Sequence, residues 1–232
     1  MTMPTSLEAF SKKFLRGLLA TYPARASNMG LHGYDGLVTD YGPSSMARRV
    51  SDLKAYRQEL AAIAPDAPPA PAWLDYHLMR LAIERELFER ETLREWARNP
   101  MVYIYSCDVS SYVKRNYAPL PVRLKAITAH LSHVPDVLSQ ARANLELPMP
   151  RTFAQTGLDI VLGTLDFLRD ELPPQLASVE DGVLMSRFSG AQGRAIAALE
   201  ALATWLRDEV LPKANEQYAI HSQKAGRTMW NK

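Results

Sequence analysis

Histidines are the residues of this chain best suited to bind a metal. His130 and His133 are three positions apart, so they share one face if the segment is helical. A zinc site normally needs three or four protein ligands, held in place by further hydrogen-bond partners. The sequence has no HExxH motif, and the other histidines stand alone at positions 32, 77 and 221. We therefore interpret His130 and His133 as polar residues of a helix surface or rim, and expect no metal, cofactor or catalytic residue in this chain.

Tyrosines gather in the middle of the chain. The stretch from Asn99 to Arg123 holds four of them and the single cysteine. They could line a ligand pocket, although at helical spacing tyrosines are also typical of core residues whose hydroxyl reaches the rim. No sequence neighbour would activate Cys107 as a thiolate, so we interpret it as a small buried apolar residue. The candidate contacts to a ligand or cleft are Tyr103, Tyr105, Tyr112, Tyr117, Arg85 and Arg123.

Arg85 is a candidate because of its position on an expected helix over residues 73–98. A projection of about 100° per residue places five apolar residues on one face: Leu74, Leu78, Leu81, Phe88 and Trp96. Arg85 falls inside this stripe, where a charge must be paired, extend to water or contact a ligand. Glu86 and Arg90 lie opposite as an i,i+4 pair, which is typical of a solvated face.

Helical periodicity runs through most of the chain, and prolines punctuate it. Pro135 should kink or split its helix, while Gly157 and Gly163 should allow close helix packing. Few segments alternate with the period of a strand. We therefore predict an all-α fold, an irregular multi-helix bundle or array with proline-punctuated turns. The expected helices cover 7–22, 43–63, 73–98, 102–113, 121–145, 152–172 and 191–211, with a short helix and loop at 175–189 and a proline-rich connector at 64–72.

The glycines at 30, 33 and 36 superficially resemble a phosphate-binding loop. A helix rather than a strand precedes them, and no GK[ST] follows, so we interpret 28–42 as a glycine-punctuated loop. The net charge of +2, from 27 basic and 25 acidic residues, argues against a nucleic-acid partner. No segment has the length of a membrane span. One cysteine cannot form an internal disulfide, so we expect a cytoplasmic protein.

Several short motifs occur in an order that resembles the DUF885 family of helical bacterial proteins. An early Gly-x-His-x-Tyr-Asp segment is followed by Asn-Pro-x-x-Tyr, and then by an aromatic-Ala-Pro-Leu turn with an arginine beyond it. In this chain the matching residues are Gly30, His32, Tyr34 and Asp35; Asn99, Pro100 and Tyr103; Tyr117 to Leu120 with Arg123; Pro135; and Ala141, Asn144 and Leu145. The resemblance covers about Leu7 to Ile220, while 221–232 departs from it and is expected to be a disordered tail outside the family pattern.

The resemblance implies zinc metallopeptidase-like chemistry, but only for longer members that carry a His-Glu zinc motif further along. This chain lacks that motif. Our first hypothesis is a truncated N-terminal helical region that forms a wall of the substrate cleft and is inert alone. Zinc and a peptide-like substrate would then concern only the whole protein, and an exposed apolar surface would favour self-association. The alternative is a self-sufficient helical binding or scaffold protein with a tyrosine-lined groove. An independent enzyme would lack any recognisable catalytic arrangement.

Overall fold

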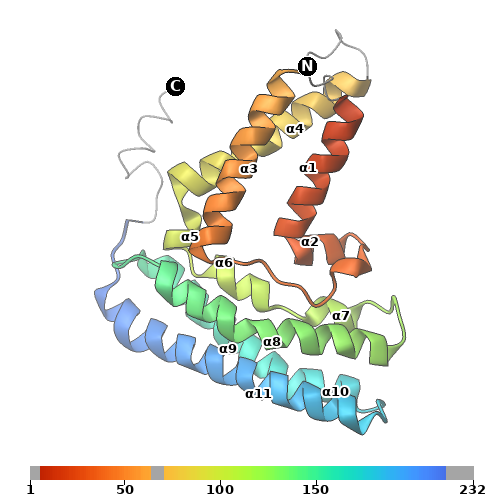
Figure 1. The fold of residues 1–232 in the computed structure, drawn as a ribbon. Coiled ribbons are helices and arrows are strands. Elements are labelled where there is room, and N and C mark those ends of the chain that lie inside the picture. Colours follow the sequence, from red (N-terminus) through yellow and green to blue (C-terminus); the bar gives the residue numbers. More distant parts are fainter. Residues whose placement is uncertain (1–5, 64–70, 218–232) are drawn as a thin grey trace. The chain divides into compact units, whose positions relative to one another are not determined.

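Helices form most of the structure, a computed structural model that describes residues 6–63 and 71–217 (Figure 1). The predicted all-α class is confirmed, with prolines at many of the helix starts and turns. The chain divides into two units: the first takes residues 1–22 and 40–94, and the second takes 23–39 and 95–232. Most of the proline-rich connector and the whole 221–232 tail lie outside the described residues.

The described part of the first unit is built from the α-helices α1 (Leu7–Thr21), α3 (Pro43–Ala61) and α4 (Pro71–Leu87). The Ser6 hydroxyl accepts a hydrogen bond from the Ala9 amide and thereby caps α1. Apolar residues spaced along one face of each helix meet in a shared core. That core contains Phe10, Phe14, Leu53, Tyr56, Leu60, Met79, Ile83 and Leu87.

The helix predicted over residues 73–98 is wrong in two respects. First, α4 continues as a π-helical segment, η2 (Phe88–Leu93), and then ends at Arg94, whose φ of 51° is left-handed; the short α5 (Glu95–Arg98) belongs to the second unit. Second, the predicted buried stripe is exposed: Leu74, Leu78 and Leu81 are 54%, 54% and 58% accessible. The helix instead buries Met79, Ile83, Glu86 and Leu87.

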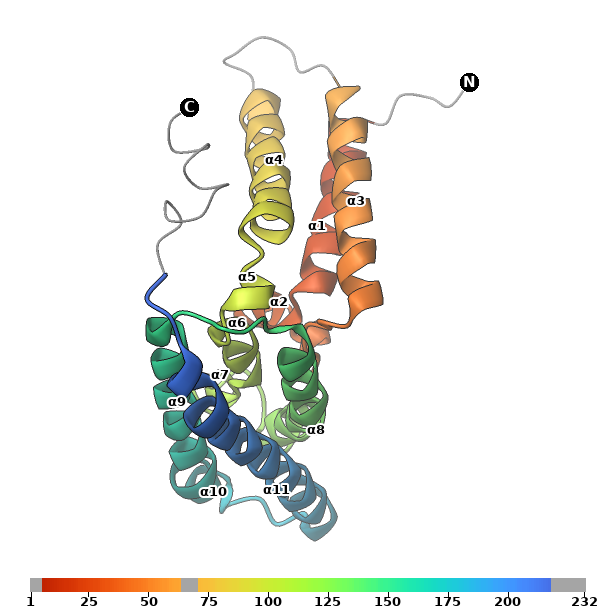
Figure 2. The same cartoon turned by 90° about the vertical axis from the view of Figure 1, so that its left-hand side faces the viewer.

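Two helix pairings organise the second unit. Helices α8 (Leu120–Asn144) and α11 (Gly182–Trp205) lie side by side, and α9 (Arg151–Asp166) packs against α11 (Figure 2). Helix α8 runs unbroken through Pro135, so the predicted split did not occur. Helix α11 starts earlier than predicted because the Asp181 carboxylate caps it at the Leu184 amide. The remaining segments are α2 (Pro23–Asn28), η1 (His32–Tyr34), α6 (Met101–Ile104), η3 (Tyr105–Cys107), α7 (Ser110–Lys114), η4 (Phe167–Glu171), α10 (Leu172–Leu176), η5 (Leu206–Val210) and η6 (Leu211–Lys213).

The predicted helix over residues 102–113 is divided into α6, η3 and α7. Asp108 adopts an extended conformation, and its carboxylate accepts a hydrogen bond from the Ser110 amide at 2.7 Å, which starts α7 afresh. Close packing at Gly157 is confirmed, because a Cβ placed there would be 2.8 Å from Pro100 Cγ. At Gly163 the prediction was wrong, since nothing lies within 4 Å of such an atom. Among the described residues, no helix is long and apolar enough to cross a membrane.

Candidate functional site

A polar cluster around Asp35 fixes the loop that follows α2. The Asp35 carboxylate accepts hydrogen bonds from the Ser27 hydroxyl and, at 2.6 Å, from the Tyr117 hydroxyl. His32 Nδ1 lies 3.1 Å from the same carboxylate, and the His32 ring stacks on Tyr117 with centroids 3.7 Å apart. Burial and the hydrogen bond to Asp35 raise the pKa of Tyr117, so this hydroxyl remains a donor. The cluster therefore brings together a serine of α2, a histidine of η1 and the carboxylate that follows it.

The order of these groups does not suit nucleophilic catalysis. A serine nucleophile needs a base in contact with its hydroxyl, with the carboxylate behind that base. Here the Ser27 hydroxyl donates to Asp35 rather than to His32. Asp35 is the shared centre of all three contacts. The arrangement therefore acts as a clamp that holds the loop against Tyr117.

Tyr112 and His130 form a buried pair beside this clamp. The Tyr112 oxygen accepts a hydrogen bond from the Gly36 amide at 3.0 Å and lies 3.4 Å from His130 Nδ1. His130 Nε2 lies 2.9 Å from the Ser106 carbonyl, which can only accept, so the network assigns the ring proton to Nε2. Burial lowers the pKa of His130 and keeps it neutral. The predicted surface position is wrong for His130, which is 1% exposed.

Arg123 holds the chain turn that follows α7. Its Nε donates to the Ala118 carbonyl at 2.8 Å, and Nη1 donates to the Tyr112 carbonyl at 2.9 Å. Nη2 donates to the Asn116 side chain at 3.2 Å. A guanidinium with its donors so directed satisfies carbonyls at the end of a helix. The structure thus places this candidate in a turn-fixing position, next to the Tyr112 backbone.

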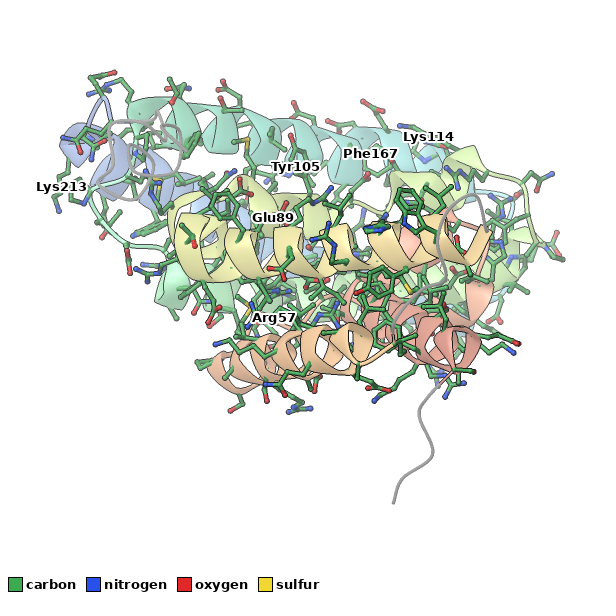
Figure 3. The ribbon with its side chains drawn as sticks, turned by 90° about the horizontal axis from the view of Figure 1, so that it is seen from above. Arg57, Glu89, Tyr105, Lys114, Phe167 and Lys213 are labelled. Atoms are coloured by element: carbon green, nitrogen blue, oxygen red, sulfur yellow. The ribbon has the colours of Figure 1, made fainter. Side chains whose placement is uncertain are left out.

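The other candidate residues lie apart from this cluster. Tyr103 is fully buried and donates its hydroxyl hydrogen to the Trp96 carbonyl. Tyr105, labelled in Figure 3, is 62% exposed. Arg85 extends from the exposed side of α4 and pairs with Glu89 at 3.0 Å. Of the four tyrosines, Tyr117 contacts Asp35 and Tyr112 contacts the adjacent Gly36 amide, so these two lie at the same loop. Cys107 is buried as predicted, and burial raises its pKa to about 12.

A buried ion cluster in the first unit was missed. Arg49 binds both carboxylate oxygens of Glu86, at 2.9 and 2.7 Å, and Arg90 Nε and the Tyr22 hydroxyl donate to the same carboxylate at 2.9 and 2.8 Å. Burial alone would raise the pKa of Glu86, but the bonds and charge of Arg49, helped by Tyr22 and Arg90, outweigh it and the pKa is lowered. One signal was available: Arg49 shares a helix face with Leu53, Tyr56 and Leu60.

The sequence profile of a family described as "Bacterial protein of unknown function (DUF885)" matches residues 23–232. The chain belongs to the DUF885 family. A solved structure of a "putative lipoprotein of unknown function" from Shewanella oneidensis is similar to this DUF885 chain, with a TM-score of 0.78 at 20% identity. The likeness covers 87% of this chain and 37% of the other, so this chain spans well under half of that protein's length. No curated protein matches.

Neither the family description nor the neighbour names an activity, so the similarity concerns the fold. Within residues 6–63 and 71–217, no group of three or more His, Cys, Asp or Glu side chains is arranged to hold a metal ion. The chemistry that these residues do offer is structural: one clamp around Asp35 and one ion cluster around Glu86.

Proposed function

We propose that this chain is a non-catalytic helical part of a DUF885 protein, which packs through α4 against further segments of a longer family member. In that protein it would form one wall of a cleft for a peptide-like substrate and support the helices that carry metallopeptidase-like chemistry. The exposed face of α4 carries the proposal. Any zinc ion would bind to the further segments of the longer protein. The expected cytoplasmic location stays a prediction.

The exposed face of α4 consists of Leu74, Leu78 and Leu81, which we call the α4 stripe. These residues recur at intervals of four and three, so they lie on one face of the helix. Met79, Ile83 and Leu87 already supply the face that packs in the first unit. Burying one leucine contributes about 1.5–3 kcal/mol, so three exposed leucines in a row are unusual on a stable protein surface.

The length of the structural neighbour agrees with this proposal. The similarity covers only 37% of that chain, so most of it lies outside the matched part and is available to cover such a face. Alone, a chain with an uncovered α4 stripe should associate with itself through the same leucines.

Dye binding and self-association test the α4 stripe. Leu78→Ser should lower the fluorescence of a dye that binds apolar surface, and should shift the chain towards monomer in light scattering at high concentration. Leu15→Ser is the matched control, because Leu15 is a similarly exposed leucine, 49% accessible, on α1 of the same unit. Equal effects of the two variants would contradict a specific role of the stripe.

The same measurements distinguish the proposal from its alternative, a self-sufficient helical binding module. Such a module would be a cooperative monomer that binds no dye. The non-catalytic part of the proposal has its own test, an assay of peptide hydrolysis by the purified chain with added zinc. Hydrolysis abolished by a chelator would overturn it.

A further inference from the structure

The packed faces of α8 and α11 leave a groove of about 520 Å³ between them. This volume lies in the range of small-molecule sites, roughly 300–1,000 Å³. Both helices belong to the second unit, so the groove does not involve the α4 stripe. Its apolar floor includes Ala129, Leu184 and Ala191, and its polar lining consists of Lys125, Arg187, Arg194, Thr128, Ser132 and Ser186.

The charge of the groove has one sign. Three cationic side chains line it, and no carboxylate does. In the part of the chain that the structure describes, Lys125, Arg187 and Arg194 form no ion pair. Two other arginines of the unit do form ion pairs: Arg151 lies 3.2 Å from Glu216, and Arg169 pairs with Glu200. Like charges left together without counterions favour an anion from solution.

Gly190 lines the groove on the α11 side. A Cβ placed at Gly190 would lie 3.6 Å from Nη1 of Arg194, so the guanidinium of Arg194 lies over this glycine, one turn back along the helix. A glycine inside a helix costs about 0.5–1 kcal/mol relative to alanine. Close packing of α11 does not explain this residue, because 3.6 Å is an ordinary van der Waals distance.

The donors of the groove identify the kind of anion. The hydroxyl hydrogens of Thr128 and Ser132 already donate to the Leu124 and Ala129 carbonyls, at 2.7 and 2.6 Å. The free donors are therefore those of the two arginines, Lys125 and Ser186. Guanidinium forks together with an ammonium group suit the oxygens of phosphate.

We propose that the groove between α8 and α11 binds a small organic phosphate, with its phosphate oxygens among Lys125, Arg187 and Arg194 and its apolar part on Ala129, Leu184 and Ala191. A nucleic-acid backbone would need a longer basic track, and the chain carries a net charge of only +2.

Calorimetric titration of the full chain with 1-naphthyl phosphate tests the proposal. We expect saturable binding that weakens with added salt, because exposed charges are screened. Inorganic pyrophosphate should bind with lower affinity because it lacks the apolar part, and 1-naphthol should bind at least about tenfold more weakly because it lacks the charge. Absence of saturation by 1-naphthyl phosphate at millimolar concentration would overturn the proposal.

Two glycines on α11 give a matched pair of variants. Gly190→Leu fills the groove and should weaken binding of 1-naphthyl phosphate about tenfold or more. Gly193→Leu makes the same change three residues along the same helix, where nothing lies within 4 Å of the added Cβ, and should leave affinity unchanged. Both changes raise helix propensity, so neither should prevent folding. Equal losses in the two variants would place the binding elsewhere.

Charge variants locate the phosphate. Arg187→Gln and Arg194→Gln should each weaken binding about tenfold, while Arg207→Gln on η5 removes the same charge outside the groove and should have no effect. If all three reduce affinity alike, the chain attracts anions only through its general charge and the groove is not a site. The dye measurement on the α4 stripe is independent of either result.

Discussion

At the scale of single residues, Glu86 is the residue whose replacement should affect folding stability most. It is 6% exposed and binds Arg49, Arg90 and Tyr22 at once. Removing one partner of a buried ion cluster leaves uncompensated charge in the interior, which costs far more than the loss of a surface pair. The consequences of replacing Glu86 should therefore be large and local.

Glu86→Gln should lower the free energy of unfolding by about 3 kcal/mol, because it leaves two buried guanidinium groups without a carboxylate. Urea unfolding measures the change. Glu84→Gln, two residues away, is the control: its pair with Arg57 spans 3.8 Å and is half exposed, so we expect at most about 0.5 kcal/mol. Similar losses in both variants would contradict the buried cluster.

Acid should destabilise the protein partly through Glu86. The pKa of Glu86 is lower in the folded state than its ordinary value of 4.5, so its contribution is complete above that value and is lost as the pH falls through the folded pKa. Urea midpoints measured from pH 6 to pH 3 should therefore fall less steeply for Glu86→Gln than for the native chain. An identical slope would show that the carboxylate gains nothing on folding.

His130 should give a second pH dependence at higher pH. Burial lowers its pKa below the ordinary 6.5, so the unfolded chain takes up a proton first, and stability decreases as the pH falls below about 6.5. His130→Gln should reduce the change of the urea midpoint with pH between pH 7 and pH 5. His133→Gln, on an exposed position of the same helix, is the matched control. A flattened slope in the His133 variant instead would contradict the assignment.

At the scale of elements, the positions of α1, α3 and α8 were predictable, and the packed face of α4 was not. The predicted ranges for α1, α3 and α8 agree with the structure because their apolar residues form a single stripe. Helix α4 carries two, one through Leu74 and Leu78 and one through Met79 and Ile83, and nothing in its periodicity says which one packs. The packed face carries Glu86, whose partner Arg49 is a residue of another helix. The clamp at Asp35 could not be predicted either, because its partner Tyr117 is 82 positions away in the sequence.

The packing of α6 on α9 should depend on Gly157. Gly157→Ala places a methyl group 2.8 Å from Pro100 Cγ, and overpacking of this kind costs about 1–3 kcal/mol. Gly163→Ala on the same helix meets nothing within 4 Å and should stabilise the protein by about 0.5–1 kcal/mol, through helix propensity. Thermal unfolding of the two variants should thus change in opposite directions. A stabilising Gly157→Ala would contradict the close approach.

At the scale of the whole molecule, the two units should respond separately to local damage. Among the described residues, the hydrophobic cluster of α1, α3 and α4 is drawn from the first unit, and each variant above lies inside one unit. In Glu86→Gln, the rate of amide hydrogen exchange should increase in α1, α3 and α4 and remain unchanged in α8 and α11. Gly157→Ala should show the reverse pattern. Faster exchange throughout the molecule in both variants would indicate a single cooperative structure.

The division of the chain between the two units has a consequence for folding during synthesis. Residues 23–39 leave the exit tunnel before the second half of the first unit, yet they belong to the second. The Gly36 amide finds its acceptor on Tyr112, 76 residues later. At about 5–20 residues per second, the loop waits roughly 4–15 s for that partner. During this interval α1, α3 and α4 can already assemble, so the first unit should mature on the nascent chain while residues 23–39 still lack their hydrogen bonds to Tyr112 and Tyr117.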